Sequence, residues 1–224
     1  MGKVYLAHRA LTWTVKEWHE PRGTNTTISM LSCSSLPLEG GFTHVECLTF
    51  LSYLHRNLSY LEYGAGTSTL LAASHCGNCV SIEGDARWIA RMRNNISANG
   101  LEKNVDLRIA HIGPTRSLSY PIWKNVTASI YCAETLRADE KFDIVLVDGR
   151  FRVACAAHAF KHLRSAESVL LVHDYTTRSW YSQMRRLYTL VATNGTLATF
   201  RPKPGVHSSS LEWDARHDAS RRVR

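Results

Sequence analysis

The sequence lacks any apolar run that approaches the ~20 residues needed to cross a bilayer, and it contains no internal repeat or low-complexity block. These absences argue against a membrane-spanning protein and against a solenoid. The low hydrophobicity of disordered chains is also missing, since 44% of the residues are hydrophobic and 21% are charged. At 224 residues the chain is expected to fold as one well-buried domain.

An excess of negative charge is absent too, because 27 Lys and Arg residues outnumber 19 Asp and Glu residues, which gives a formal net charge of +8. A positive field attracts nucleic acids, anionic surfaces and anionic small molecules alike. Much of the excess lies near the end of the sequence, in Arg216, Arg221, Arg222 and Arg224. We interpret residues 207–224 as a basic, flexible tail, and we do not expect a nucleic-acid partner.

No charged-then-apolar export signal opens the sequence, and the cysteines are scattered through apolar or mixed segments. We therefore expect a reducing, cytoplasmic setting. Cys76 and Cys79 have a metal-site or redox spacing, but no second cysteine or histidine pair accompanies them, so neither role is expected. Asparagine sequons occur at Asn25, Asn57, Asn95, Asn125 and Asn194. Without export they are expected to stay unmodified.

From residue 58 onward, short β-rich apolar runs alternate with amphipathic stretches, the pattern of parallel strands joined by crossover helices. The predicted strands span about 58–63, 79–83, 105–110, 142–148 and 168–173. Asn194-Gly195 lies between two further β-rich runs and predicts an antiparallel hairpin at the sheet edge. The fold class is therefore α/β, with a mostly parallel sheet covered by helices on both faces.

Helices are predicted between these strands. In residues 86–98, Trp88, Ile89, Met92 and Ile96 recur at helical spacing. The other predicted helices span about 43–56, 68–74, 152–163 and 178–187, and residues 111–141 are expected to form an inserted loop with a short helix. We expect an N-terminal helical and loop segment at 1–57 that contributes to the cover of the active site, followed by the folded core at 58–206.

Glycines directly follow the first predicted strand, where residues 62–68 read EYGAGTS. Gly64 and Gly66 permit a sharp turn and a close approach of a ligand, and the next helix begins there with free amide donors. One strand later, Glu83 stands where Rossmann-type sites bind ribose hydroxyls. A dinucleotide fingerprint would need a third glycine at position 69, which is a threonine. This departure argues against NAD and FAD.

The EYGAGTST segment resembles motif I of class I methyltransferases that use S-adenosylmethionine (SAM), and FDIVLVD at 142–148 resembles motif IV. The resemblance covers residues 42–201 and implies a Rossmann-like, seven-stranded sheet in the order 3-2-1-4-5-7-6, with strand 7 antiparallel. It implies SAM as the cofactor. By motif position it places Glu62, Gly64, Ala65, Gly66 and Ser68 around the methionine part of SAM, Glu83 and Gly84 at the adenosine, and His111 and Ile112 beside the adenine.

The segments VDGRFRVACAAHAF and LLVHDYTTRSWY also resemble a small subgroup of these methyltransferases. A weaker resemblance connects the chain to methyltransferase domains joined to sugar transferases in large algal viruses. Only the second, weaker resemblance bears on the substrate, and it points to a sugar or glycan as the methyl acceptor.

Asp148, His173 and Asp174 follow two predicted neighbouring strands, at the edge where open α/β sheets bind ligands. A hydroxyl acceptor benefits from a base or from a metal that lowers its pKa, so we predict that these three residues are catalytic, with His173 as general base or metal ligand. The arrangement resembles metal-dependent catechol and macrolide-sugar O-methyltransferases. This resemblance implies Mg²⁺ on Asp148 and Asp174, although His173 replaces the acid usual at its position. The structural alternatives are a turn-capping Asp148 and a partly buried His173.

Arg150 and Arg152 alternate after Asp148 and could together hold an anionic group of the acceptor, the alternative being a surface pair at the start of a helix; of the two, Arg150 is kept as a substrate-binding candidate. Tyr175 is a candidate for an apolar wall with Trp180 and Tyr181. The leading prediction is SAM-dependent O-methylation of a small hydroxylated acceptor such as a sugar or glycan. One alternative is an RNA or protein methyltransferase, although no NPPY-type motif follows the fourth predicted strand. A second alternative is a non-catalytic SAM- or nucleotide-binding module.

Overall fold

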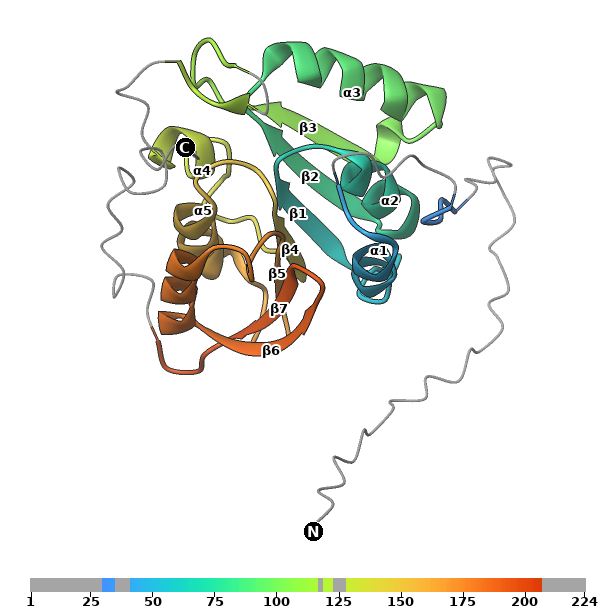
Figure 1. Cartoon of the computed structure of the whole chain (residues 1–224). Coiled ribbons are helices and arrows are strands. Elements are labelled where there is room, and N and C mark those ends of the chain that lie inside the picture. The colour runs from blue at the N-terminus through green and yellow to red at the C-terminus, as the bar shows by residue number, and fades with distance from the viewer. Residues whose placement is uncertain (1–29, 35–40, 117–118, 123–127, 207–224) are drawn as a thin grey trace, which may run out of the picture.

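The computed structural model describes residues 30–34, 41–116, 119–122 and 128–206, so the predicted basic tail lies outside the described residues. The described strands form one sheet in the order β3-β2-β1-β4-β5-β7-β6 (Figure 1). Neighbours pair in parallel except at β7, which runs antiparallel to both β5 and β6. The strands are β1 (Ser59–Tyr63), β2 (Asn78–Glu83), β3 (Val105–Ile109), β4 (Ile144–Val147), β5 (Val169–Val172), β6 (Tyr188–Asn194) and β7 (Leu197–Pro202).

Helices cover both faces of the sheet, and two buried apolar clusters fill the space beneath them. One face carries α1 (His44–Leu51), α2 (Thr67–His75) and α3 (Ala86–Ala98). The other carries α4 (Ala128–Cys132), α5 (Arg152–Ala159) and the 3₁₀ helices η3 (Phe160–His162) and η4 (Ser179–Arg186), and the short η1 (Glu102–Asn104) precedes β3. The predicted fold class, strand order and Asn-Gly hairpin are thereby confirmed.

The local sequence explains where α3 begins. Asp85 caps the helix, because its carboxylate accepts hydrogen bonds from the backbone amides of Arg87 and Trp88. Ile89 and Met92 are buried on the side that faces the sheet. The predicted bounds of this helix match the structure, which shows that capping and helical periodicity act together here.

Three predicted helices differ from the structure. The helix predicted over 152–163 ends at Ala159 and is followed by the 3₁₀ helix η3. The helix predicted over 43–56 ends at Leu51, where Ser52 turns the chain towards β1. The segment predicted as a helix over 178–187 forms the 3₁₀ helix η4. Its buried side chains, Tyr181 and Met184, and the buried Leu187 that follows it recur every three residues, which matches the three-residue turn of a 3₁₀ helix.

Two disulfides join the helices to neighbouring parts of the chain. Cys33–Cys47 connects the segment before α1 to that helix, and Cys132–Cys155 connects α4 to α5. Disulfides persist in oxidising compartments, so the expected reducing setting is not supported. Among the described helices, none is long and apolar enough to cross a membrane.

Candidate active site

The loops after β1 and β4 touch at the middle of the sheet. Gly64 has a φ of +100°, and a Cβ atom at this position would lie 2.6 Å from the backbone of Gly149. Only glycine combines this backbone conformation with so close an approach. The contact lies at the point where the strand order reverses, which is where open α/β sheets bind their ligands.

The second glycine of the motif faces open space. The nearest atom to a Cβ placed at Gly66 is Oγ of Ser68, 4.0 Å away. The backbone amide of Gly66 donates a hydrogen bond of 3.0 Å to Thr69, which fixes the start of α2. A polar ligand can therefore approach the loop backbone and the amino end of α2 at this point.

Trp88 contacts the glycine loop, a role that its helical spacing did not predict. Its indole Nε1 donates a hydrogen bond of 2.7 Å to the carbonyl oxygen of Ala65, in the glycine loop. Helical spacing groups Trp88 with Ile89, Met92 and Ile96, but unlike those three it is 39% exposed. It therefore supports the loop from outside, a contact that helical spacing alone does not reveal.

Glu62 lies beneath the glycine loop in the protein interior. Its carboxylate accepts hydrogen bonds from the hydroxyls of Tyr60, Ser68, Thr69 and Ser81. Burial raises the pKa of Glu62 to about 7, although these hydrogen bonds oppose the shift. The side chains of Glu62 and Ser68 therefore hold the loop from below, which differs from the expectation that they surround a cofactor.

Glu83 ends β2 as predicted and is 3% exposed. One carboxylate oxygen accepts hydrogen bonds from the amide of Gly84 at 2.6 Å, the amide of Asp85 at 2.9 Å and the hydroxyl of Ser119 at 2.6 Å. Burial raises the pKa of Glu83 against the effect of these bonds. The carboxylate thus already accepts a hydrogen bond from a hydroxyl group, as it would from a ribose.

The residues predicted beside the adenine differ in their exposure. Ile112 is buried, and a Cβ atom at Gly84 would collide with its side chain. His111 is exposed at the end of β3. Gly84 is therefore required for packing at this position, while His111 stays free to face a ligand.

Asp148, His173 and Asp174 meet at the ends of β4 and β5, with their potential ligand atoms within 4.8 Å of one another. Nδ1 of His173 lies 2.9 Å from Oδ1 of Asp148, and Nε2 lies 3.6 Å from Oε2 of Glu46. Carboxylates thus face the imidazole ring from two sides. The sequence predicted Asp148, His173 and Asp174 as site residues, but it did not predict Glu46.

Glu46 comes from α1, far from the other site residues in the sequence. Its carboxylate forms a capping box with Thr43 and accepts hydrogen bonds of 2.6 and 2.7 Å from the amide and hydroxyl of Thr196. Burial alone would raise the pKa of Glu46, but the bonds from Thr43 and Thr196 lower it to about 2. The Thr43-x-x-Glu46 pattern predicts only a helix start, so it gives no sign of a site residue.

Arg152 is buried between the two aspartates. Its guanidinium lies 3.0 Å from a carboxylate oxygen of Asp148 and 3.0 Å from one of Asp174. It also donates hydrogen bonds to the carbonyl oxygens of His173 and Gly149. Magnesium requires close oxygen ligands in octahedral geometry, and a cation already bridges both carboxylates here. The residues present therefore do not fit the predicted magnesium site.

The charges in this cluster stabilise one another. Burial alone would raise the pKa of Asp148, but Arg152 and His173 lower it. Burial alone would lower the pKa of His173, but the hydrogen bond to Asp148 and the negative charge of that carboxylate raise it. Both ring nitrogens of His173 face carboxylates, which favours the protonated ring, and its role as general base stays a prediction. Asp148 and Asp174 are more accessible, with 24% and 30% of their side chains exposed.

Backbone strain occurs beside this cluster. Phe151 and Asp174 follow β4 and β5 closely, and they have φ angles of +54° and +56°. A left-handed conformation costs a residue with a side chain roughly 1–2 kcal/mol. Such strain concentrates at functional sites, where the surrounding structure enforces it.

The two predicted substrate-binding residues have different surroundings. The guanidinium of Arg150 lies 4.1 Å from the ring centre of Tyr120 and stays partly exposed. Tyr175 is 8% exposed, packs edge-on against Phe200 and accepts a hydrogen bond from Arg185. The ring of Tyr175 thus packs into the core over β7, and its role in an acceptor wall stays a prediction.

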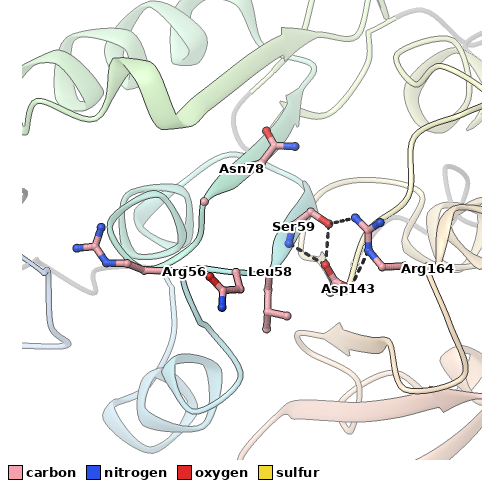
Figure 2. Close-up of a pocket in the computed structure, with 8 residues that line it drawn as sticks. Arg56, Leu58, Ser59, Asn78, Asp143 and Arg164 are labelled. Atoms are coloured by element: carbon pink, nitrogen blue, oxygen red, sulfur yellow. Dashed lines mark hydrogen bonds and ion pairs between the residues drawn. The ribbon is translucent and has the colours of Figure 1, made fainter. Parts of the chain in front are cut away.

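A cavity of about 530 Å³ lies at the opposite edge of the sheet, where β1 and β2 begin (Figure 2). Within it, Asp143 accepts hydrogen bonds from Ser59 and forms an ion pair of 2.9 Å with Arg164. The other lining residues are Arg56, Asn57, Leu58, Gly77 and Asn78. This cavity is separate from the cluster at Asp148, because it lies at the other end of the strands.

The strand order, the glycine loop and the polar cluster at the switch point define a class I methyltransferase fold. No family model and no curated protein matches the chain. A solved structure of a methyltransferase-like protein from Silicibacter pomeroyi has 30% sequence identity, a TM-score of 0.61, and covers 74% of this chain and 90% of its own. The chain therefore belongs to the class I SAM-dependent methyltransferase family.

Two other solved structures are similar at lower identity. Precorrin-6Y C5,15-methyltransferase from Geobacter metallireducens has 16% identity and a TM-score of 0.49 over 68% of this chain and 83% of its own. N-methyltransferase NodS from Bradyrhizobium japonicum has 16% identity and a TM-score of 0.46 over 69% of this chain and 91% of its own.

Proposed function

We propose that this chain transfers the methyl group of SAM to a hydroxyl of a small polar acceptor, with sugars or glycans as the substrate class. The observation that carries the proposal is the partly exposed carboxylate of Asp148, one residue before the contact between Gly149 and Gly64. An acceptor bound to this carboxylate would lie beside the glycine loop, so donor and acceptor would meet at the switch point.

Residues of the glycine loop and of its surroundings would hold SAM. The open space at Gly66 and the amino end of α2 suit the methionine part, and Glu83 suits the ribose hydroxyls. When bound, SAM supplies a methyl group on a positively charged sulfur, and the bond to that sulfur breaks as the bond to the acceptor oxygen forms. His111 borders the adenine end of this site.

Asp148 would accept a hydrogen bond from the acceptor hydroxyl and aim an oxygen lone pair at the methyl group. The hydroxyl becomes acidic as it is methylated, and its proton passes to the carboxylate of Asp148. Arg152 and His173 fix the orientation of that carboxylate and keep it ionised. His173 is therefore a positioning residue in this proposal, and Arg150 would contact an anionic substituent of the acceptor.

The proposed reaction uses no divalent ion, because the guanidinium of Arg152 supplies the positive charge between Asp148 and Asp174. A metal ion at this position would have to displace a buried arginine that also binds two backbone carbonyl oxygens. Such a displacement would leave a guanidinium without its partners in the protein interior.

The test is incubation with methyl-labelled SAM and a panel of sugars and glycans, with RNA and protein as comparison acceptors, each with and without EDTA. We expect a labelled methyl ether that survives alkali, formed at the same rate in chelator. Asp148→Asn should lower turnover by about 10²- to 10⁴-fold and leave SAM affinity unchanged, while the exposed Asp139→Asn should have no effect.

Three results would contradict the proposal. Label found only in RNA or protein would change the acceptor class. SAM binding without transfer to any acceptor would indicate a binding module. Loss of activity in EDTA, restored by Mg²⁺ or Mn²⁺, would return the metal to the mechanism.

A further inference from the structure

The Cys33–Cys47 disulfide lies next to a residue of the polar cluster. Cys47 directly follows Glu46 in α1, and the bond ties that helix to the segment at 30–34. Glu46 in turn binds Thr196 and faces His173. The disulfide therefore holds the helix that supplies one side of the cluster.

The Cys132–Cys155 disulfide supports the opposite side. It joins α4 to α5, and α5 begins with Arg152. Tyr131, beside Cys132, packs against the ring of Phe151, and its hydroxyl would collide with a Cβ atom built at Gly149. The bond therefore fixes the helices that enclose the loop after β4.

Asparagine sequons are frequent in this sequence, since five of its nine asparagines belong to one. Asn57 and Asn95 are exposed, and Asn25 and Asn125 lie outside the described residues. Asn57 lines the cavity where β1 begins, and Asn95 lies in the last turns of α3, which runs back from the end of β2. Both asparagines thus lie at the end of the sheet where the parallel strands begin, opposite the end that carries Asp148 and His173.

We propose that this protein matures in an oxidising compartment with N-glycosylation machinery, where the two disulfides fix the walls of the active site and Asn57 and Asn95 carry N-linked glycans. Disulfides form and persist in such compartments. N-linked glycans require a surface sequon in the same setting. Glycans at these positions would leave the polar cluster open, because they lie at the other end of the strands. Asn194 is outside the proposal, since its turn adjoins Glu46.

The first test uses protein isolated from its source cells with a thiol-blocking reagent present during lysis and denaturation. Mass spectrometry without reduction should find peptides joined through Cys33–Cys47 and through Cys132–Cys155, with the blocking reagent on Cys76 and Cys79. Enzymatic glycan removal in heavy-oxygen water should convert Asn57 and Asn95 to labelled aspartate.

Asn78 and Asn99 are matched controls for the glycan measurement, because both are exposed and neither belongs to a sequon. Neither should acquire the label. Blocking reagent on all four of the paired cysteines, or unlabelled Asn57 and Asn95, would overturn the proposal.

The second test measures thermal stability with and without reductant, and it needs no enzymatic activity. Reduction should lower the Tm of the wild-type protein by roughly 10 °C or more, because opening two loops frees the unfolded chain. A variant with serine at Cys33, Cys47, Cys132 and Cys155 should not respond to reductant. Serine at Cys76 and Cys79 should leave the wild-type response intact. An unchanged Tm after complete reduction would overturn the proposed role of the disulfides.

Discussion

A buried guanidinium between two carboxylates dominates the electrostatics of the candidate site. Arg152 is 5% exposed and makes ion pairs of 3.0 Å with both Asp148 and Asp174. Removing the arginine leaves two neighbouring carboxylates, with only 24% and 30% of their side chains exposed, without their counter-charge, which is costlier than losing an exposed pair.

Arg152→Met is therefore expected to lower the free energy of unfolding by about 3–5 kcal/mol, measured by urea denaturation. Arg150→Met is the matched control, because Arg150 is partly exposed and stacks on Tyr120. It should lower the free energy of unfolding by less than about 1 kcal/mol. Equal losses in the two variants would show that the bridging position of Arg152 has no special effect on stability.

His173 should make the stability depend on pH above neutrality. Its pKa in the folded protein is raised above the ordinary value of 6.5 by Asp148, so folding favours its protonated form. The stabilisation is complete below about pH 6.5 and is lost as the pH rises through the raised pKa. Between pH 6 and 9, the free energy of unfolding should fall in the wild type, and His173→Asn should remove this part of the decrease.

The exposed His44 supplies the control, and His44→Asn should keep the wild-type pH dependence. Parallel pH profiles for the wild type and His173→Asn would mean that the pKa of His173 is the same in the folded and unfolded states.

The residues of the site differ in how far the sequence could predict them. Asp148, His173 and Asp174 each follow a buried apolar run, so their meeting at one sheet edge follows from the strand pattern. Glu46 binds Thr196 across 150 positions of the chain, and no local pattern specifies that contact. The bridging role of Arg152 also depends on how α5 packs, which is a tertiary property.

At the scale of elements, the glycine loop contains two glycines with different requirements. A Cβ atom at Gly64 meets the backbone of Gly149, whereas a Cβ atom at Gly66 points into open space. The first glycine is needed for the two loops to pack, and we expect the second to be needed for a ligand to approach. The sequence motif predicts both positions but does not distinguish these roles.

Gly66→Val is expected to leave the unfolding free energy within about 1 kcal/mol of the wild type and to weaken SAM binding by at least about 100-fold, measured by calorimetry. Gly64→Ala should instead destabilise the fold by more than about 2 kcal/mol, because it adds a clash to a strained φ. Gly100→Ala separates the backbone strain from the clash. Gly100 has a φ of +65° but no atom within 4 Å of a Cβ, so this variant shows the effect of the strained backbone alone.

A loss of SAM binding that occurs only together with unfolding of Gly66→Val would refute this division of roles.

The elements themselves were predicted best where the pattern is strong and local. The helix at 86–98 has a capping aspartate and a clear apolar stripe, so its bounds match. The segment at 178–187 has an apolar spacing close to helical, but burial every third residue selects the 3₁₀ form. Only tertiary packing decides between the two, because Tyr181 and Met184 are buried in the same apolar cluster as residues of α5.

At the scale of the whole molecule, binding of the cofactor should stabilise the folded state, because a ligand that binds only that state shifts the unfolding equilibrium. SAM at about 100 times its Kd adds about 2.7 kcal/mol, which corresponds to a rise in Tm of roughly 5–11 °C for a chain of this size. NAD⁺ should leave the Tm unchanged in the same thermal scan. A rise with NAD⁺ and none with SAM would contradict the cofactor assignment.

The backbone contact between Gly64 and Gly149 also limits how this molecule can be redesigned. The loop that would bind the donor and the loop that begins at Asp148 share one surface with no room for a side chain on either. A substitution at Gly64 or at Gly149 must therefore push the other loop aside, and its effect will depend strongly on the residue opposite. Laboratory evolution of a new acceptor preference should succeed when both loops are randomised or grafted together, and it should stall when they are varied one at a time.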